Sequence, residues 1–273
     1  MDMLHQSLLP FVVFRVTAMK EEIFLLCGED DQKKVNVYDR NNMAEVKEVI
    51  ALPGIRPVDI EACNVSNCVY VLGLNMERKC PSILRMARDG EHHQFNILPW
   101  ISGLKLPVYT LSVCAKGMLY VPQGENPAAV GIYNAIGSLA SSVDIHGFRY
   151  VDRVIQRSNG NLVLASITDD HSERVLTEID TDGKIQRQYR SSLGEGSRVD
   201  VANMRGRIMI RKLPRGMELL DPELNLLEAV DCGFIGIFAA FNLLHYDSER
   251  NEAITVIVYK RGDSLIIISR ENE

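Results

Sequence analysis

Apolar and polar residues alternate along the chain in pairs of extended runs that are joined by short polar turns. The clearest pair is the stretch from Pro57 to Val71, in which an extended run, an Asn/Ser turn and a second run rich in Val and Tyr follow one another. This order is typical of a β-hairpin. Weaker copies occur on both sides, and their second strands align at Phe24, Tyr70, Tyr120, Val163, Met209 and Thr255. These centres lie about 43 to 50 residues apart, so the sequence predicts six repeats.

Each repeat contains about four short β-rich runs, and no stretch shows the apolar periodicity of a helix. In the second repeat the runs are 58–63, 68–72, 83–87 and 94–98. Turns rich in Asp, Asn and Gly follow the third runs, at 39–42, 88–91, 134, 180–183 and 221–222. Such turns fit tight hairpins. Four antiparallel strands at this repeat length are typical of a propeller blade, so we expect an all-β, six-bladed β-propeller of four-stranded antiparallel blades.

The two ends of the chain bear on how such a propeller closes. The last repeat has three predicted strands, at 241–246, 253–259 and 264–269, whereas Met1 to Leu9 belongs to no repeat. We expect Met1 to Leu9 to supply the missing outer strand, which leaves no open sheet edge at the junction. The chain is then a single domain with blades at approximately 10–56, 57–106, 107–149, 150–198, 199–240 and 241–273 plus 1–9.

Composition narrows the classes of function. The 273 residues are 46% hydrophobic and 24% charged, with a formal net charge of −6, as in an ordinary globular protein. The acidic balance excludes a surface that is basic all over. No apolar run approaches the roughly 20 residues that span a bilayer, and Leu8 to Phe14 lacks the basic segment that precedes a signal-peptide core. We therefore predict a cytoplasmic protein that does not contact membranes and whose six cysteines are free.

The order of motifs within the repeats resembles that of NHL repeats. The sequence has Pro-x-Asp-Ile at 57–60, followed by a polar turn, Leu-Tyr-Val at 119–121, and an Asp-Gly turn at 182–183. The resemblance covers essentially the whole chain and implies a six-bladed propeller like those at the C-termini of TRIM-NHL proteins, with a surface that binds protein or RNA. The sequence shows neither RING-type Cys/His spacing nor a coiled-coil heptad, so nothing in it supports ubiquitin-ligase activity.

Cationic residues stand at the starts of the predicted inner strands, the first strand of each blade. Because these strand starts crowd around the channel on one face of a propeller, we expect a basic rim there. Loops between second and third strands open on the same face and add further cations. The predicted basic rim consists of Arg56, Lys105, Arg149, Arg198, Arg211, Lys212 and Arg215. Arginine offers a planar fork that suits an acidic peptide or RNA phosphates, although ordinary solvated loop charges give the same pattern.

A second set of polar residues occupies the third position of the inner-strand motif, where the first repeat has Val13. This predicted channel-mouth ring consists of Asp59, Tyr109, Asp152, Asp200 and Asn242. Three carboxylates and an amide are suitable oxygen ligands for a divalent cation, and six-bladed lactonases build a catalytic metal site from such residues. An arginine precedes each of the three aspartates by two or three residues. This spacing favours local ion pairing, and we predict no metal site.

Together these features predict a non-catalytic binding module, monomeric and without a cofactor, that recognises a protein or peptide through its channel-mouth face. Single-stranded RNA is the first alternative partner. It is disfavoured by the net acidity and by the few aromatic residues near the basic rim, since single-strand binders combine basic and aromatic groups. The second alternative is a metal-dependent hydrolase of the lactonase type that uses the Asp/Asn ring.

Overall fold

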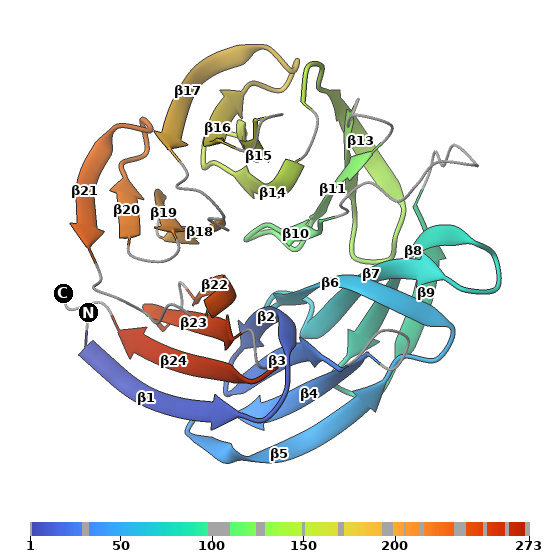
Figure 1. Ribbon diagram of the computed structural model, residues 1–273. Coiled ribbons are helices and arrows are strands. Elements are labelled where there is room, and N and C mark those ends of the chain that lie inside the picture. The colour runs from blue at the N-terminus through green and yellow to red at the C-terminus, as the bar shows by residue number, and fades with distance from the viewer. Residues whose placement is uncertain are drawn as a thin grey trace. The chain divides into compact units, whose positions relative to one another are not determined.

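The chain folds into short antiparallel sheets (Figure 1). The computed structural model describes residues 2–28, 33–97, 110–123, 129–148, 151–168, 172–192, 199–204, 206–212, 216–231, 239–247, 250–259 and 262–270. Within these ranges there are 24 strands and no helix, so the described residues include no helix long and apolar enough to cross a membrane. The strands form six four-stranded sheets, which confirms the prediction of an all-β protein built from six propeller blades.

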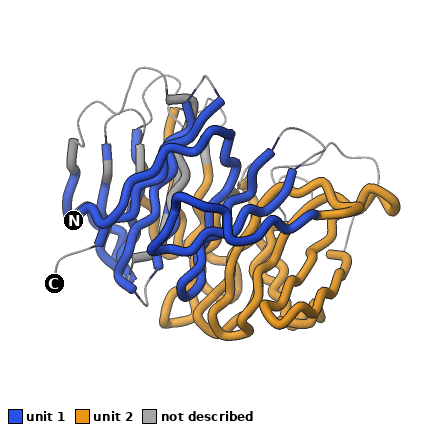
Figure 2. The backbone as a smooth tube through the Cα atoms, turned by 90° about the horizontal axis from the view of Figure 1, so that it is seen from below, with its two compact units in different colours: residues 1–51, 191–273 blue, residues 52–190 orange. Residues whose placement is uncertain are grey.

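Three blades belong to one compact unit, Met1–Ala51 with Ser191–Glu273 (blue in Figure 2). Blade 1 consists of β2 (Val13–Met19), β3 (Glu22–Cys27), β4 (Lys34–Asp39) and β5 (Asn42–Ala51). Blade 5 consists of β18 (Val199–Met204), β19 (Arg207–Lys212), β20 (Gly216–Leu220) and β21 (Leu226–Asp231). Blade 6 consists of β22 (Ala239–Asp247), β23 (Glu252–Tyr259), β24 (Ser264–Arg270) and β1 (Asp2–Leu9). The inner strand β22 contacts both other inner strands of this unit, β18 and β2.

The other compact unit, Leu52–Arg190, holds the remaining blades (orange in Figure 2). Blade 2 consists of β6 (Ile55–Cys63), β7 (Cys68–Asn75), β8 (Cys80–Ala87) and β9 (His92–Asn96). Blade 3 consists of β10 (Ser112–Val113), β11 (Leu119–Gln123), β12 (Ala129–Tyr133) and β13 (Leu139–Asp144). Blade 4 consists of β14 (Val151–Gln156), β15 (Leu162–Ile167), β16 (Glu173–Ile179) and β17 (Ile185–Ser192). The two-residue inner strand β10 contacts the inner strands β6 and β14.

The hairpins form where the sequence predicts them. All six predicted second-strand centres lie in second strands, namely β3, β7, β11, β15, β19 and β23. In three of the predicted turns, the side-chain oxygen of Asn134, Asp180 or Asp221 accepts hydrogen bonds of 2.8–3.2 Å from the N–H groups two and four residues further on. These side chains satisfy backbone donors that the tight turn leaves unpaired, which is why Asn and Asp mark the turns in the sequence.

Two of these turns also pack against the preceding blade of the orange unit. Gly137 and Gly183 have positive φ angles of 86° and 81°. A Cβ atom on Gly137 would lie 2.2 Å from the ring of Phe95, and one on Gly183 would lie 2.0 Å from the carbonyl oxygen of Asp144. Both the backbone conformation and the neighbouring blade therefore exclude a side chain at these tips.

The outer strand of blade 6 comes from the N-terminus, as predicted. β1 pairs antiparallel with β24, with Asp2 opposite Arg270 and Leu9 opposite Ser264. Ser264 also fixes the start of blade 1, because its Oγ donates a hydrogen bond to the carbonyl of Phe11 (2.9 Å) and accepts one from the N–H of Val13 (3.2 Å). The N-terminal strand thus covers the edge that β24 would otherwise expose.

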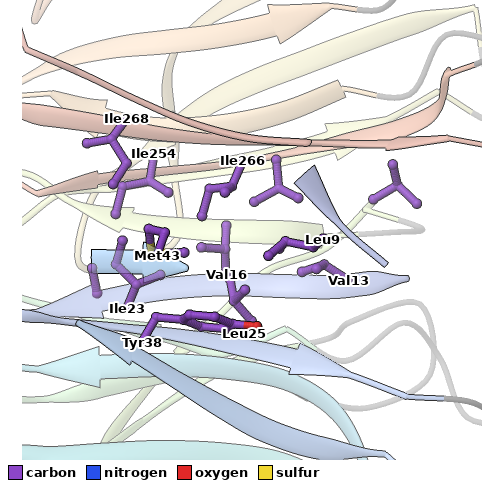
Figure 3. Packing of buried hydrophobic residues seen from close by; sticks show 13 residues of the cluster. Leu9, Val13, Val16, Ile23, Leu25, Tyr38, Met43, Ile254, Ile266 and Ile268 are labelled. Carbon is purple, nitrogen blue, oxygen red and sulfur yellow. The ribbon is translucent and has the colours of Figure 1, made fainter. Parts of the chain in front are cut away.

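Apolar side chains fill the space between blade 6 and blade 1 (Figure 3). Isoleucines of β23 and β24 lie on one side of this cluster, and Leu9 of β1 joins them. Facing them are side chains of blade 1, chiefly Val16, Ile23 and Leu25. These three are at most 3% exposed, and burial of each contributes about 1.5–3 kcal/mol. The apolar side chains that alternate along these strands are therefore buried where blade 6 packs against blade 1.

A buried ionic cluster lies beside this apolar core. Arg40, in the turn after β4, donates to Asp247 (Nη2 to Oδ2, 2.6 Å) and to Glu252 (Nη1 to Oε2, 2.9 Å), and the three side chains are only 2–3% exposed. Arg270 of β24 donates to the other oxygen of Glu252 at 2.6 Å. Because buried charges are stable only when they are paired and hydrogen-bonded, this cluster specifies how blade 6 meets blade 1.

Five described cysteines, Cys27, Cys63, Cys68, Cys80 and Cys114, are free, as expected, and Cys232 lies outside the described residues. Burial raises the pKa of Cys27 to about 11, so that this thiol stays protonated at neutral pH. A protonated buried thiol is a poor nucleophile, and Cys27 acts as a small core residue.

Deletion of Met1–Leu9 is expected to lower the melting temperature by more than about 5 °C and to promote aggregation, because β24 would lose its ladder partner. Circular dichroism melting and light scattering measure these effects. The control is Met3→Ser, which changes a side chain that is 64% exposed on the same strand and should melt like the wild type. A deletion variant that melts unchanged would show that β1 does not stabilise blade 6.

Replacement of Arg40 by Met is expected to cost about 3–5 kcal/mol of unfolding free energy, because the buried carboxylate of Asp247 loses the cation that binds it and that of Glu252 keeps only Arg270. Urea unfolding measures this loss. The matched control is Lys47→Met, which breaks the pair with Glu22 but removes an ammonium group whose side chain is 52% exposed, so it should cost less than about 1 kcal/mol. Equal losses in the two variants would contradict the structural role of the cluster.

Candidate functional site

Four inner strands contain a β-bulge near their first residue. The register shifts between Val13 and Arg15 in β2, Pro57 and Asp59 in β6, Val151 and Arg153 in β14, and Ala239 and Phe241 in β22. A bulge adds one residue to one strand and redirects the side chains that follow it. The bulges therefore shift only the first residues of these strands, up to Val13, Pro57, Val151 and Ala239, whereas the residues after them keep the register of the hairpin.

Ladder partners define which residues stand at equivalent places near the channel mouth. Two residues after five of the six second-strand centres, the ladder partners on the inner strands are Arg15, Asp59, Arg153, Asp200 and Asn242. Asp59, Asp200 and Asn242 thus share one position, as the sequence alignment has it. Val13 and Asp152 do not, because the hairpin registers of blades 1 and 4 bring Arg15 and Arg153 to it instead. Tyr109 lies outside the described residues.

Asp59 is a buried contact between blades 2 and 3. Its side chain is 0% exposed, and its Oδ2 accepts hydrogen bonds from Thr110 Oγ1 (3.0 Å) and from the N–H of Leu111 (2.8 Å). Its Oδ1 accepts a third from the N–H of Ile60 (3.0 Å). A carboxylate with this many donors is well compensated for burial. Asp59 therefore joins the inner strand of blade 2 to the chain that enters β10.

The predicted basic rim is described only in part. Arg56 is exposed on β6, opposite Leu74. Arg211 and Lys212 end β19, where they pair in the ladder with Asp200 and Val199. The other four members, Lys105, Arg149, Arg198 and Arg215, lie outside the described residues. The rim as a whole stays a prediction.

The metal alternative also stays a hypothesis for the ring. Across the ranges that the structure describes, no group of three or more His, Cys, Asp or Glu residues is arranged to hold a metal ion. The side chains of Asp152, Asp200 and Asn242 are not among the described atoms. The three hydrogen bonds of Asp59 already occupy its two oxygens, which argues against a metal ligand at that position.

The inner strands of the orange unit contain a charge pair that the sequence analysis missed. Arg153 of β14 donates from Nη1 to Oε2 of Glu61 on β6, at 3.1 Å, and each side chain is 15% exposed. The pair links the inner strands of blades 2 and 4. Glu61 is the one charged residue among the described ladder partners of the second-strand centres, which are otherwise Thr17, Ser112, Ile155, Ala202 and Leu244. A charged residue at a position that is neutral in the other described blades is the sequence signal that could have identified the Glu61–Arg153 pair.

The backbone on both sides of this pair is held firmly. Glu61 stands opposite Tyr70 in the ladder, and Tyr70 is buried and donates from its hydroxyl to the carbonyl of Ala135 (3.3 Å). Burial raises the pKa of Tyr70, so this hydroxyl keeps its proton. On the other strand, the N–H next to Arg153, that of Val154, donates to Ser112 Oγ at 3.2 Å. The hydrogen bonds of neighbouring residues thus hold the backbone on either side of Glu61 and Arg153, whose side chains are still partly exposed to solvent.

Comparison with known proteins identifies relatives in fold. No family model and no curated protein matches the chain. A solved protein of unknown function from Bacteroides caccae is similar at 14% identity and a TM-score of 0.62, over 89% of this chain and 92% of that one. A streptogramin B lyase is similar at 11% identity and a TM-score of 0.61, over 98% and 88%. A virginiamycin B lyase from Staphylococcus aureus is similar at 10% identity and a TM-score of 0.56, over 97% and 98%.

These neighbours correct the functional expectation. The prediction of a non-catalytic binding module is contradicted, because two of the solved structures that share the fold over nearly the whole chain are enzymes. The six-bladed propeller is supported, whereas these neighbours are lyases and not NHL proteins. Enzymatic propellers therefore occur within this fold, at identities that establish the fold alone.

Asp59→Asn is expected to lower the free energy of unfolding by about 1–3 kcal/mol, because an amide presents one acceptor fewer to three buried donors. Urea unfolding measures the change. Asp180→Asn is the control, since it loses the same acceptor but its three donors are exposed and can bond to water, so stability should change by less than about 0.5 kcal/mol. Wild-type stability of Asp59→Asn would argue against the interblade role.

Proposed function

We propose that this protein is an enzyme of the lyase class that acts on a negatively charged substrate. The observation that carries this proposal is the similarity to two lyases, each over at least 97% of this chain. A lyase cleaves a bond by elimination, so no water is added across it. Such a reaction needs a base that removes a proton and cationic or polar groups that stabilise the negative charge that develops.

The blue unit contains residues of these kinds on neighbouring strands. Asp200 of β18 pairs in the ladder with Arg211 of β19, and Lys212 follows at the strand end. Asn242 lies on β22, the inner strand that contacts β18. In the proposed reaction the carboxylate of Asp200 removes the proton, and the cations with the Asn242 amide stabilise the developing oxyanion.

The charge of the chain bears on the substrate class. The basic residues near the inner-strand starts favour an anionic group on the substrate, because arginine binds carboxylates and phosphates through its planar fork. The net charge of −6 and the low aromatic content of 7% favour a peptide-like substrate over a nucleic acid. A peptidic anion is therefore the proposed substrate class.

The first test is incubation of the purified protein with a streptogramin B compound, followed by mass spectrometry. The expected products together have the mass of the substrate. Asp200→Asn should reduce kcat/KM by about 10²–10⁴-fold, as expected for loss of a general base. The control is Asp182→Asn, a change in an exposed hairpin turn that should leave turnover unchanged.

The masses of the products separate the possible reactions. Products that have gained one water would identify a hydrolase and contradict the lyase class. Absence of turnover would exclude streptogramin B as the substrate. Full activity of the Asp200→Asn variant would remove this residue from the reaction whatever the products are.

A further inference from the structure

We propose that Arg153 is a binding site for a carboxylate ligand, and that Glu61 supplies the carboxylate that such a ligand displaces. This site lies within the orange unit and is independent of the lyase proposal, which concerns residues of the blue unit. We infer this from the exposure of the pair, from its place in the fold and from the bulge in β14 that directly precedes Arg153.

The exposure of the pair differs from that of the other ion pairs in the described chain. Arg40 and its two carboxylates are 2–3% exposed, which leaves no route for a ligand. At the other extreme, the arginine of the Arg190–Glu173 pair is 56% exposed, as is usual for a surface contact. Arg153 and Glu61 lie between these limits at 15% each. Their charged groups are largely desolvated and still accessible, which is the environment in which a charged ligand binds most strongly.

The position of the pair is the second argument. Glu61 and Arg153 come from the inner strands of blades 2 and 4, and the inner strand between them, β10, has only two residues. β10 contacts both neighbours, and its Ser112 fixes the backbone beside Arg153. The shortness of β10 lets the two charged side chains meet past it, at the inner edge of three consecutive blades. Propellers place their ligand sites at this edge, where loops and strand starts of several blades converge.

The bulge in β14 is the third argument. The register shift falls at Asp152, directly before Arg153. Bulges are common next to functional sites because they redirect a side chain without breaking the sheet. The regular ladder between the hairpin turn and this bulge gives Arg153 the same ladder position as Asp59, the residue that joins blade 2 to blade 3. Blade 4 thus has an arginine, next to a bulge, at the ladder place where blade 2 has a buried carboxylate.

The chemistry of the pair suits exchange of one carboxylate for another. The contact is made from Nη1 of Arg153 to one oxygen of Glu61, at 3.1 Å. A guanidinium group binds carboxylates strongly through its planar fork, so a carboxylate that enters from solvent is a suitable replacement for that of Glu61. Since one carboxylate replaces another, the buried cation keeps a partner throughout and the desolvation cost does not recur.

Isothermal titration calorimetry tests the site with three probes: succinate, the peptide acetyl-Ala-Ala with a free carboxylate, and the same peptide as its C-terminal amide. We expect a carboxylate probe to bind the wild type and the amide to fail. Stronger binding of succinate than of acetyl-Ala-Ala identifies a small-molecule site, and the reverse order identifies a peptide terminus. Binding should weaken between low and high salt, because the interaction is between charges.

Variants separate ligand binding from a purely structural pair. Glu61→Gln should raise the affinity for the carboxylate probe about tenfold, because it removes the internal competitor. Arg153→Gln should abolish binding. The double variant Glu61→Gln/Arg153→Gln replaces the ion pair by neutral groups. It should also fail to bind the probe, but its melting temperature should be close to that of the wild type. Arg187→Gln, which breaks the pair with Glu178 in blade 4, is the control and should bind normally.

The outcomes decide the proposal in both directions. Tighter binding by Glu61→Gln together with loss of binding by the double variant supports the site. The site would be refuted if neither the wild type nor Glu61→Gln bound any carboxylate probe, or if the double variant bound as well as the wild type. None of these results depends on turnover, so the lyase proposal stands or falls separately.

Discussion

Buried polar side chains that reach from one blade to the backbone of the next are the constraint on which the fold depends. Asp59 binds the N–H of Leu111, Ser112 binds the N–H of Val154, and Ser264 binds both Phe11 and the N–H of Val13. Apolar burial between blades is strong but non-directional, whereas an unpaired buried polar group costs about 1–3 kcal/mol. Each bond therefore fixes the position of a blade against its neighbour, and the apolar clusters fill the space so defined.

The strands and turns could be predicted from sequence because their signals are local. Val and Tyr runs mark the second strands, and Asn134, Asp180 and Asp221 mark turns because their side chains bond to backbone donors a few residues away. Closure by Met1–Leu9 was predictable for a different reason: the repeat pattern leaves the last blade one strand short, and Met1–Leu9 belongs to no other repeat. Periodicity and turn chemistry are sufficient for a repeat fold of this kind.

The site could be predicted less well because its signals are not local. The composition of an inner strand does not reveal its pairing register, and the ladder brings Arg15 and Arg153 to the places that sequence alignment gives to Val13 and Asp152. Asp59 looks like a channel residue in the sequence, and its role as an interblade contact depends on Thr110 and Leu111, which are about 50 residues away along the chain. The partner of Glu61 is more distant still.

Exposure is what separates the structural charges of this protein from the charges that are available for chemistry. At 0–3% exposure, Asp59 and the Arg40 cluster are committed to protein partners, because any ligand would first have to replace those bonds within a closed interface. At 15% exposure, Glu61 and Arg153 are mostly removed from water, which strengthens their attraction to opposite charges, and both side chains still contact solvent. On β6, the buried Asp59 and the partly exposed Glu61 are only two residues apart. The same types of charged side chain can therefore hold the blades together at one position and face solvent at the next. This explains why residue type alone, an aspartate or an arginine near a strand start, does not distinguish the two roles.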